Sequence, residues 1–301
     1  MKRFCWVDAR ALKTNCTVCL WVLGLLWCPT LLAQENRVAA PAAVAYGSNA
    51  AAGHRLLCED AQIYYEVYGT GKPLLLLHGG LFGYIDEFSE FIPELAQHYQ
   101  VIAIATRGHG RSELGRQALT YELFARDALA VLDHVTREKA CIFGFSDGAI
   151  TTYAMALQHP ERLDRVIAMG GGPLSITDYT PQGLAEGKTL SGEGLAKAMP
   201  DFVAGRKKLM PQPELWPDFV ERLKALYQSE SYLDRARLGA VPVPFLLIMG
   251  EHDPYASLET FVRLYRTFPH AQIAIAPGCG HCVLTERPQL TRELIRSFLP
   301  D

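Results

Sequence analysis

The sequence predicts an α/β fold in which buried parallel strands alternate with helices. Three short apolar runs, at 73–77, 140–143 and 243–249, lack helical caps and are typical of strands covered on both faces. Each run leads into a loop that contains glycine, and a helical pattern follows the second run at 149–159. With 301 residues and 49% hydrophobic content, the chain can bury one large core, so we expect a single main domain.

The N-terminus has the pattern of an export signal. An uncharged apolar stretch at 16–33 follows four basic residues, Lys2, Arg3, Arg10 and Lys13. We therefore expect a signal peptide at 1–33, cleaved after Ala33, and a periplasmic or secreted protein. An uncleaved membrane anchor and a cytosolic extension are the alternatives, because about 18 apolar residues lie near the minimum that spans a bilayer. The Ala-rich segment 34–55 is expected to be a flexible linker before a domain at 56–301.

The apolar run at 140–143 leads into a G-x-S-x-G pattern at 144–148. Between a strand and a helix, glycines that flank a serine allow a turn sharp enough to expose the hydroxyl above the sheet. Ser146 is therefore the candidate nucleophile for attack on a carbonyl carbon. A plain loop is the alternative for this pattern taken alone.

A glycine loop follows the first apolar run, at His78-Gly79-Gly80. The oxyanion that forms during acyl transfer needs two backbone N–H donors, and glycine lets the main chain approach a substrate closely. We assign these donors to Gly80 and Asp147, because the Asp147 amide follows the serine and lies at a helix N-terminus, which favours negative charge. A simple turn after a strand is the alternative for the glycine loop.

Two further candidates follow later strands. The run at 243–249 leads into a loop with Asp253, and a strand expected at 272–276 leads into a loop with His281. Histidine can remove a serine proton near neutral pH, and a carboxylate can orient the imidazole. With Ser146 first in the chain, the order of these residues is the nucleophile, acid, histidine order of α/β-hydrolases.

Neighbouring residues are weaker candidates for the same roles. His252 directly precedes Asp253, and a base adjacent in sequence to its orienting acid would point elsewhere. Glu251 is the alternative acid. His78 and His109 are expected to be structural loop residues.

The chain resembles α/β-hydrolase-fold enzymes, in particular the esterase, enol-lactonase and valacyclovir-hydrolase-like branch. The matching stretches occur in the family's order at 74–80, 101–112, 141–148, 159–169, 248–254 and 278–281. The resemblance implies a mostly parallel eight-stranded sheet flanked by helices, with a small helical lid. It also implies a triad of Ser146, His281 and Asp253 that forms an acyl-enzyme, which water then hydrolyses. Serine at the turn favours acyl chemistry, because dehalogenases and epoxide hydrolases of this fold use an aspartate there.

The lid is expected at about 173–238, where strand-like runs are absent and helical patterns occur at 194–208 and 216–229. Such lids control which substrate enters. Six apolar residues of this segment either roof an acyl pocket or attach the lid to the core: Leu209, Met210, Leu215, Trp216, Phe219 and Leu223.

The side chain of Asp147 supports two interpretations. Helix capping is the expected role, because the dipole stabilises a carboxylate at a helix N-terminus. A preference for a cationic leaving group is the alternative.

Four cysteines remain after residue 33: Cys58, Cys141, Cys279 and Cys282. Cys141 is expected to be a buried free thiol. A local disulfide between Cys279 and Cys282, a redox role and a zinc half-site stay open.

The predicted function is hydrolysis of a small carboxylic ester or lactone without a cofactor or metal. The net charge is −3, and the sequence has no basic patch, His-Glu-x-x-His pattern or phosphate loop, so we expect no nucleic-acid, metal or nucleotide partner. A membrane contact is expected only through an uncleaved N-terminal segment. The alternatives are a weakly catalytic binding protein of the same fold, an acyltransferase and an aminopeptidase; the natural substrate and oligomeric state stay open.

Overall fold

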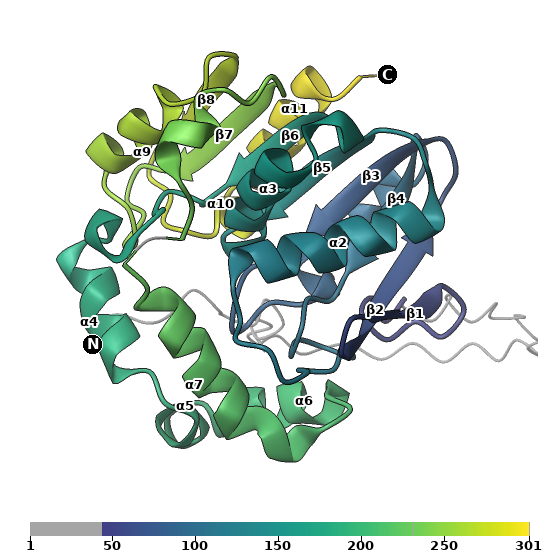
Figure 1. Ribbon diagram of the computed structural model, residues 1–301, viewed down its shortest axis with the longest axis vertical. Coiled ribbons are helices and arrows are strands. Elements are labelled where there is room, and N and C mark those ends of the chain that lie inside the picture. Colours follow the sequence, from purple (N-terminus) through teal and green to yellow (C-terminus); the bar gives the residue numbers. More distant parts are fainter. Residues whose placement is uncertain (1–43, 231, 301) are drawn as a thin grey trace, which may run out of the picture. The chain divides into compact units, whose positions relative to one another are not determined.

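An eight-stranded sheet forms the centre of this computed structural model, which describes residues 44–230 and 232–300. The strand order is β1-β2-β4-β3-β5-β6-β7-β8; β2 pairs antiparallel with β1 and β4, and the other neighbours are parallel. The strands are β1 (Gly53–Cys58), β2 (Ala61–Tyr68), β3 (Lys72–Leu77), β4 (Tyr99–Ile104), β5 (Ala140–Phe145), β6 (Leu163–Met169), β7 (Phe245–Gly250) and β8 (Ala271–Ala276). Helices flank the sheet (Figure 1), so the predicted fold class is confirmed.

Apolar clusters cover both faces of the sheet. Successive side chains of a strand point to opposite faces, so neighbouring residues of a strand belong to different clusters. Leu75 and Leu77 of β3 belong to one apolar cluster, and Leu74 and Leu76 belong to the other. The first cluster includes side chains of α2 (Tyr121–Val135), α3 (Asp147–Gln158) and α9 (Leu258–Tyr265); the second includes those of α1 (Ile92–Leu95), α10 (Val283–Glu286) and α11 (Pro288–Phe298). Strands β5 and β7 near the centre of the sheet are therefore apolar and buried along their whole length.

The parallel arrangement brings the sequence motifs to one edge of the sheet. Strands β3, β5, β6, β7 and β8 are consecutive parallel neighbours. The loops that follow their carboxyl ends therefore emerge at the same edge. These loops contain Gly80, Ser146, Asp253 and His281.

A helical segment lies between β6 and β7, where the sequence analysis expects the lid, and we refer to it as the lid. Its helices are α4 (Pro181–Thr189), α5 (Gly192–Ala198), α6 (Pro200–Leu209), α7 (Trp216–Tyr227) and α8 (Arg235–Leu238). Figure 1 shows α4 to α7 grouped together beyond the sheet. The helical pattern at 194–208 is divided into two helices, because Pro200 lacks the N–H of a helix interior and begins α6 instead.

Five of the six apolar lid residues, all but Leu209, attach the lid to the core. Met210, Trp216, Phe219 and Leu223 are buried and belong to the same cluster as α2 and α3, with Leu215 packed against it. Their burial supports the attachment role rather than a roof over an open acyl pocket.

The folded part of the chain begins before residue 56. Strand β1 starts at Gly53, and the N–H groups of Gly47 and Asn49 each donate to the buried carboxylate of Glu66 at 2.8 Å. These contacts place the last residues of the expected linker in the domain. The expected signal peptide at 1–33 lies outside the described residues.

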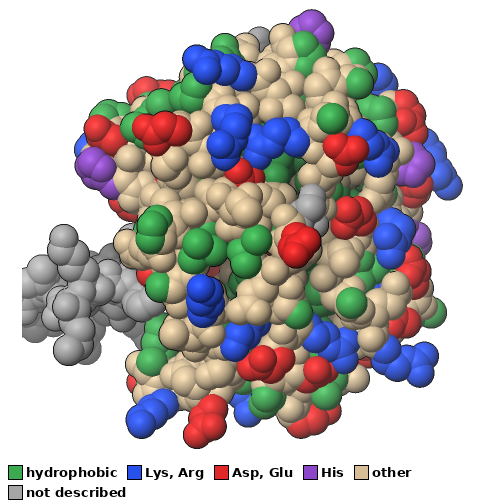
Figure 2. Space-filling view, turned by 60° about the vertical axis from the view of Figure 1, so that its left-hand side comes forward, with side chains coloured by type: hydrophobic (Ala, Val, Ile, Leu, Met, Phe, Trp, Pro, Cys, Tyr) green, Lys and Arg blue, Asp and Glu red, His purple; other side chains and the backbone are tan. Residues whose placement is uncertain are grey.

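The surface of the lid side carries mixed charge. Figure 2 shows Lys and Arg side chains interspersed with Asp and Glu on this face. No helix within 44–230 and 232–300 is both long and apolar enough to cross a membrane.

Arg107 connects the first hairpin with α2 inside the protein. Its side chain is fully buried; Nε and Nη2 donate to the two oxygens of Asp127 at 2.5 and 3.0 Å, and Nη1 pairs with Asp60. Nη2 also donates to the carbonyl of Cys58 at 2.9 Å. The guanidinium therefore pairs with two carboxylates, the buried Asp127 and the partly exposed Asp60.

We expect Arg107→Ala to lower the free energy of unfolding by about 3–5 kcal/mol, because it leaves the buried Asp127 carboxylate unpaired. Arg126→Ala is the matched control, since Arg126 pairs with Glu59 at a surface where both side chains are 46% exposed. That change should cost under about 1 kcal/mol. Urea unfolding measures both, and equal losses would contradict the structural role of the buried cluster.

Candidate active site

Ser146 lies on a sharp turn between β5 and α3. Its backbone has φ +54° and ψ −117°, a conformation that a non-glycine residue rarely adopts. A Cβ on Gly148 would overlap the carbonyl oxygen of Leu77, and a Cβ on Gly144 would overlap that of Gly148. The N–H of Ser146 donates to the carbonyl of Met169 at 2.7 Å. The two glycines therefore allow the close packing that holds the strained serine.

The structure brings Ser146, His281 and Asp253 into one hydrogen-bonded chain. His281 Nε2 lies 2.9 Å from Ser146 Oγ, and His281 Nδ1 lies 2.7 Å from Asp253 Oδ2. The other carboxylate oxygen, Oδ1, accepts the backbone N–H of Tyr255 at 2.8 Å, and the Tyr255 ring lies edge-on to the imidazole. The Asp253 side chain is 1% exposed, so its bond to the imidazole is shielded from water.

The surrounding charges favour the protonated form of His281. Burial lowers its pKa, but the charge and hydrogen bond of Asp253 raise it, and the carboxylates of Asp147 and Glu87 raise it further. The net result is a pKa above the usual value. An imidazole in this position can accept a proton from the serine hydroxyl and remain stable as an imidazolium.

The glycine loop after β3 packs directly against this turn. A Cβ on Gly79 would lie 3.4 Å from Ser146 Cβ and 3.2 Å from the ring of Phe145. Within the described part of the chain, the N–H groups of Gly80 and Asp147 have no hydrogen-bond acceptor. Two N–H groups without an acceptor therefore belong to the residues that the sequence analysis assigns as oxyanion donors, and that role stays a prediction.

Glu87 is a site residue that sequence reasoning missed. It lies in the short helix η1 (Ile85–Phe88), and its Oε2 accepts the N–H of Gly79 at 2.7 Å. Burial raises the pKa of Glu87 to about 7, against the lowering effects of the Gly79 hydrogen bond and of Arg206. The carboxylate anchors the glycine loop through a backbone contact, which has no recognisable sequence signal.

The expectation that Asp147 caps α3 is wrong, because its side chain bonds elsewhere. Oδ1 accepts the hydroxyl of Tyr121 at 3.0 Å, and Oδ2 accepts the hydroxyl of Tyr227 at 2.8 Å. Burial raises the pKa of Asp147 to about 6, whereas the two hydroxyl donors lower it. The carboxylate thus connects α2 with the lid helix α7.

The weaker candidates of the sequence analysis, which are His78, His109, His252 and Glu251, do not take part in the Ser146–His281–Asp253 hydrogen bonds. The side chain of His252 is 69% exposed, and Glu251 accepts a backbone N–H from the loop that carries His281. His78 and His109 are buried with ring centroids 4.8 Å apart, and burial lowers the pKa of both. These contacts agree with structural roles.

Among the described residues, Cys58, Cys141, Cys279 and Cys282 form no disulfide with one another. Burial raises the pKa of the Cys141 thiol to about 12. Across residues 44–230 and 232–300, no group of three His, Cys, Asp or Glu side chains is placed to hold a metal ion.

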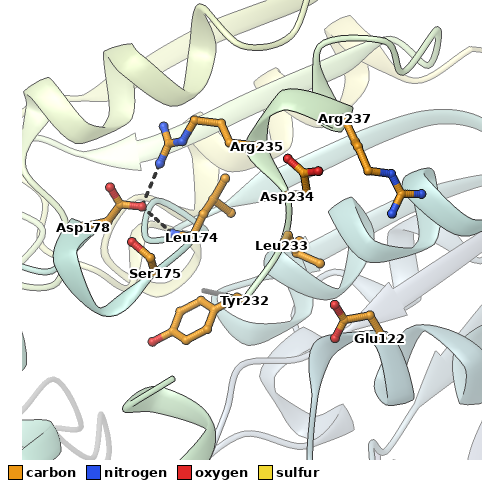
Figure 3. Close-up of a pocket in the computed structure, with 9 residues that line it drawn as sticks. All are labelled: Glu122, Leu174, Ser175, Asp178, Tyr232, Leu233, Asp234, Arg235 and Arg237. Atoms are coloured by element: carbon orange, nitrogen blue, oxygen red, sulfur yellow. Dashed lines mark hydrogen bonds and ion pairs between the residues drawn. The ribbon is translucent and has the colours of Figure 1, made fainter. Parts of the chain in front are cut away.

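A separate polar cavity of about 500 Å³ lies beside the lid (Figure 3). Its wall includes Asp178, which accepts the N–H of Leu174 at 2.9 Å and pairs with Arg235 at 2.7 Å and Arg263 at 2.5 Å. These contacts connect both ends of the lid segment with α9. The cavity wall is formed by Glu122, Leu174, Ser175, Asp178, Tyr232, Leu233, Asp234, Arg235 and Arg237, so it does not include the serine site.

A model of the alpha/beta hydrolase family matches residues 74–294. The chain belongs to this family. It is 26% identical over 265 residues to 2-hydroxy-6-oxononadienedioate/2-hydroxy-6-oxononatrienedioate hydrolase 2 of Pseudomonas putida, across 80% of this chain and 92% of that protein.

Two solved structures resemble this alpha/beta hydrolase in fold. The enol-lactonase from Burkholderia xenovorans LB400 matches with a TM-score of 0.65 and 21% identity, covering 82% of this chain and 100% of that one. The carboxylesterase CesB from Bacillus subtilis matches with a TM-score of 0.65 and 21% identity, covering 82% and 90%. Family membership and these relatives support a hydrolase that acts on small molecules.

We expect Glu87→Gln to lower the pKa of His281. Glutamine keeps an oxygen that can accept the Gly79 N–H, but it removes a negative charge that raises the histidine pKa. NMR titration of the His281 ring protons measures the change. Glu90→Gln is the control, because the Glu90 side chain is 68% exposed, and this change should leave the pKa of His281 unchanged. An unchanged His281 pKa in Glu87→Gln would rule out the charge coupling.

Proposed function

We propose that this alpha/beta hydrolase cleaves a small carboxylic ester or lactone through an acyl-enzyme. The observation that carries the proposal is the chain from Ser146 Oγ through His281 to the buried carboxylate of Asp253, with contacts of 2.9 and 2.7 Å. A hydroxyl is a weak nucleophile unless a base lies within hydrogen-bond reach. The same arrangement has no evident purpose in a protein that only binds a ligand.

In the first half-reaction, Ser146 Oγ attacks the carbonyl carbon while His281 Nε2 takes the hydroxyl proton. Asp253 holds the Nδ1–H tautomer and stabilises the imidazolium. The N–H groups of Gly80 and Asp147 donate to the carbonyl oxygen as it becomes negative, and a single such donor is worth about 3 kcal/mol in the transition state. His281 then protonates the departing alcohol, and the acyl group stays on the serine.

In the second half-reaction, water attacks the acyl-enzyme. His281 removes a proton from the water, and the same two N–H groups stabilise the second oxyanion. Collapse of this intermediate returns the proton to Ser146 and releases the acid. A lactone follows the same steps, except that the released alcohol and acid are one molecule.

Two alternatives use the same residues. An acyltransferase would differ only in the acceptor that replaces water, and an aminopeptidase would release an amine in place of an alcohol. The enol-lactonase and carboxylesterase neighbours favour the ester and lactone classes.

We also propose that the protein is exported. The support for this is the order of the basic residues, the apolar stretch at 16–33 and the polar sequence after it.

Replacing Ser146 with alanine tests the proposal directly. We expect turnover of p-nitrophenyl acetate and of a small lactone to fall by a factor on the order of 10⁴ or more, since the nucleophile is lost. Ser297→Ala, at an exposed serine of α11, is the control and should keep full activity. Retained turnover in a folded Ser146→Ala protein would contradict the mechanism.

Removal of the Asp147 charge tests whether the site prefers substrates with a cationic leaving group. If its carboxylate attracts such a group, Asp147→Asn should lower kcat/KM for an amine-bearing ester by about tenfold and leave a neutral ester of the same size within about threefold. Paired kinetics on the two esters measure this. An equal loss on both would assign Asp147 a role that does not depend on substrate charge.

A further inference from the structure

A carboxylate, a lid hydroxyl and the glycine loop meet at one point beside Ser146. Asp147 Oδ2 accepts the hydroxyl of Tyr227 at 2.8 Å. A Cβ on Gly80 would overlap both Asp147 Oδ2 and Tyr227 Oη. Tyr227 belongs to α7, so the lid reaches the residue that follows the serine and the residue assigned as the second N–H donor.

The position of the Asp147 carboxylate creates an electrostatic problem for ester cleavage. A negative charge close to the oxyanion opposes the charge that develops on the substrate oxygen. Along the described chain, no Lys or Arg forms an ion pair with Asp147. The hydroxyls of Tyr121 and Tyr227, one from α2 and one from the lid, therefore share the compensation of this charge with His281.

The lid holds Tyr227 firmly in place. Its helix α7 buries Phe219, Leu223 and Leu226 in the core. The backbone carbonyl of Tyr227 also accepts the hydroxyl of Tyr232 at 2.6 Å. The seating of α7 on the core therefore determines where the Tyr227 hydroxyl lies.

We propose that Tyr227 is a positioning residue through which the seated lid makes Ser146 fully reactive. Its hydroxyl keeps the Asp147 carboxylate directed toward α2 and α7, away from the forming oxyanion. The inference rests on the proposed acyl chemistry at Ser146. It assigns the lid a direct part in reactivity, in addition to substrate entry.

The rate of Ser146 phosphonylation by a small fluorophosphonate tests this role without a known natural substrate. We expect Tyr227→Phe to lower the maximal inactivation rate constant, kinact, by about tenfold to hundredfold, the effect of losing a hydrogen bond to a charged group. The half-saturating concentration, KI, should stay within about threefold, because the lost hydroxyl is engaged by the Asp147 carboxylate. Tyr153→Phe is the matched control; it removes a buried hydroxyl of α3 that has no partner and should leave both constants unchanged.

A double-mutant cycle separates positioning from packing. In an Asp147→Asn background, Tyr227→Phe should change kinact by less than about threefold, since the charge that Tyr227 compensates is gone. Tyr121→Phe should show the same dependence on Asp147. Equal losses from Tyr227→Phe in both backgrounds, or no loss in either, would overturn the proposal.

The same experiment distinguishes this inference from the proposed function. Rapid labelling of Ser146 without turnover of any ester or lactone would reject the proposed hydrolysis and leave the Tyr227 result valid. Ester turnover with full kinact in Tyr227→Phe would reject the positioning role and leave hydrolysis standing. Circular dichroism and thermal unfolding of each variant verify that α7 remains folded.

Discussion

The contact between the end of β3 and the start of α3 is the constraint on which the site depends. Gly148 approaches the carbonyl of Leu77 so closely that no side chain fits between them. Because β3 and β5 are parallel neighbours, this contact sets the glycine loop against the turn that carries Ser146. The strained backbone of that serine is tolerated because the surrounding core over-determines it. In the proposed mechanism, a wider separation would move the Gly80 N–H away from the oxygen to which it is to donate.

A second constraint is the number of carboxylates around one imidazole. Asp253, Asp147 and Glu87 all raise the pKa of His281, but each is held by different donors. Asp253 bonds the ring itself, Glu87 accepts a backbone N–H of the glycine loop, and Asp147 accepts two tyrosine hydroxyls. Asp253 therefore serves the histidine directly, whereas Glu87 holds the glycine loop and Asp147 connects α2 with the lid.

The sequence predicts those parts of the molecule that depend on local chain order. Apolar runs locate the buried strands, and residues that follow parallel strands converge on one edge, which is why Ser146, Asp253 and His281 can be named in advance. Long-range contacts have no such signal. Asp147 satisfies a local rule for helix capping, yet its partner Tyr227 lies 80 residues away. Glu87 is recognisable only once its contact with a backbone N–H is known.

The lid illustrates why apolar composition alone does not define a substrate roof. Trp216, Phe219 and Leu223 are buried in the core, so their contribution is to anchor α7. An anchored helix can place a hydroxyl within hydrogen-bond distance of a fixed partner, because close-packed interiors leave little room for displacement. If the lid were loosely attached, the hydrogen bond from Tyr227 to Asp147 would be the first contact to lose its geometry. The buried apolar side chains and the Tyr227 hydroxyl thus act together. The apolar side chains fix α7 on the core, and the Tyr227 hydroxyl then donates to Asp147, the residue that follows Ser146.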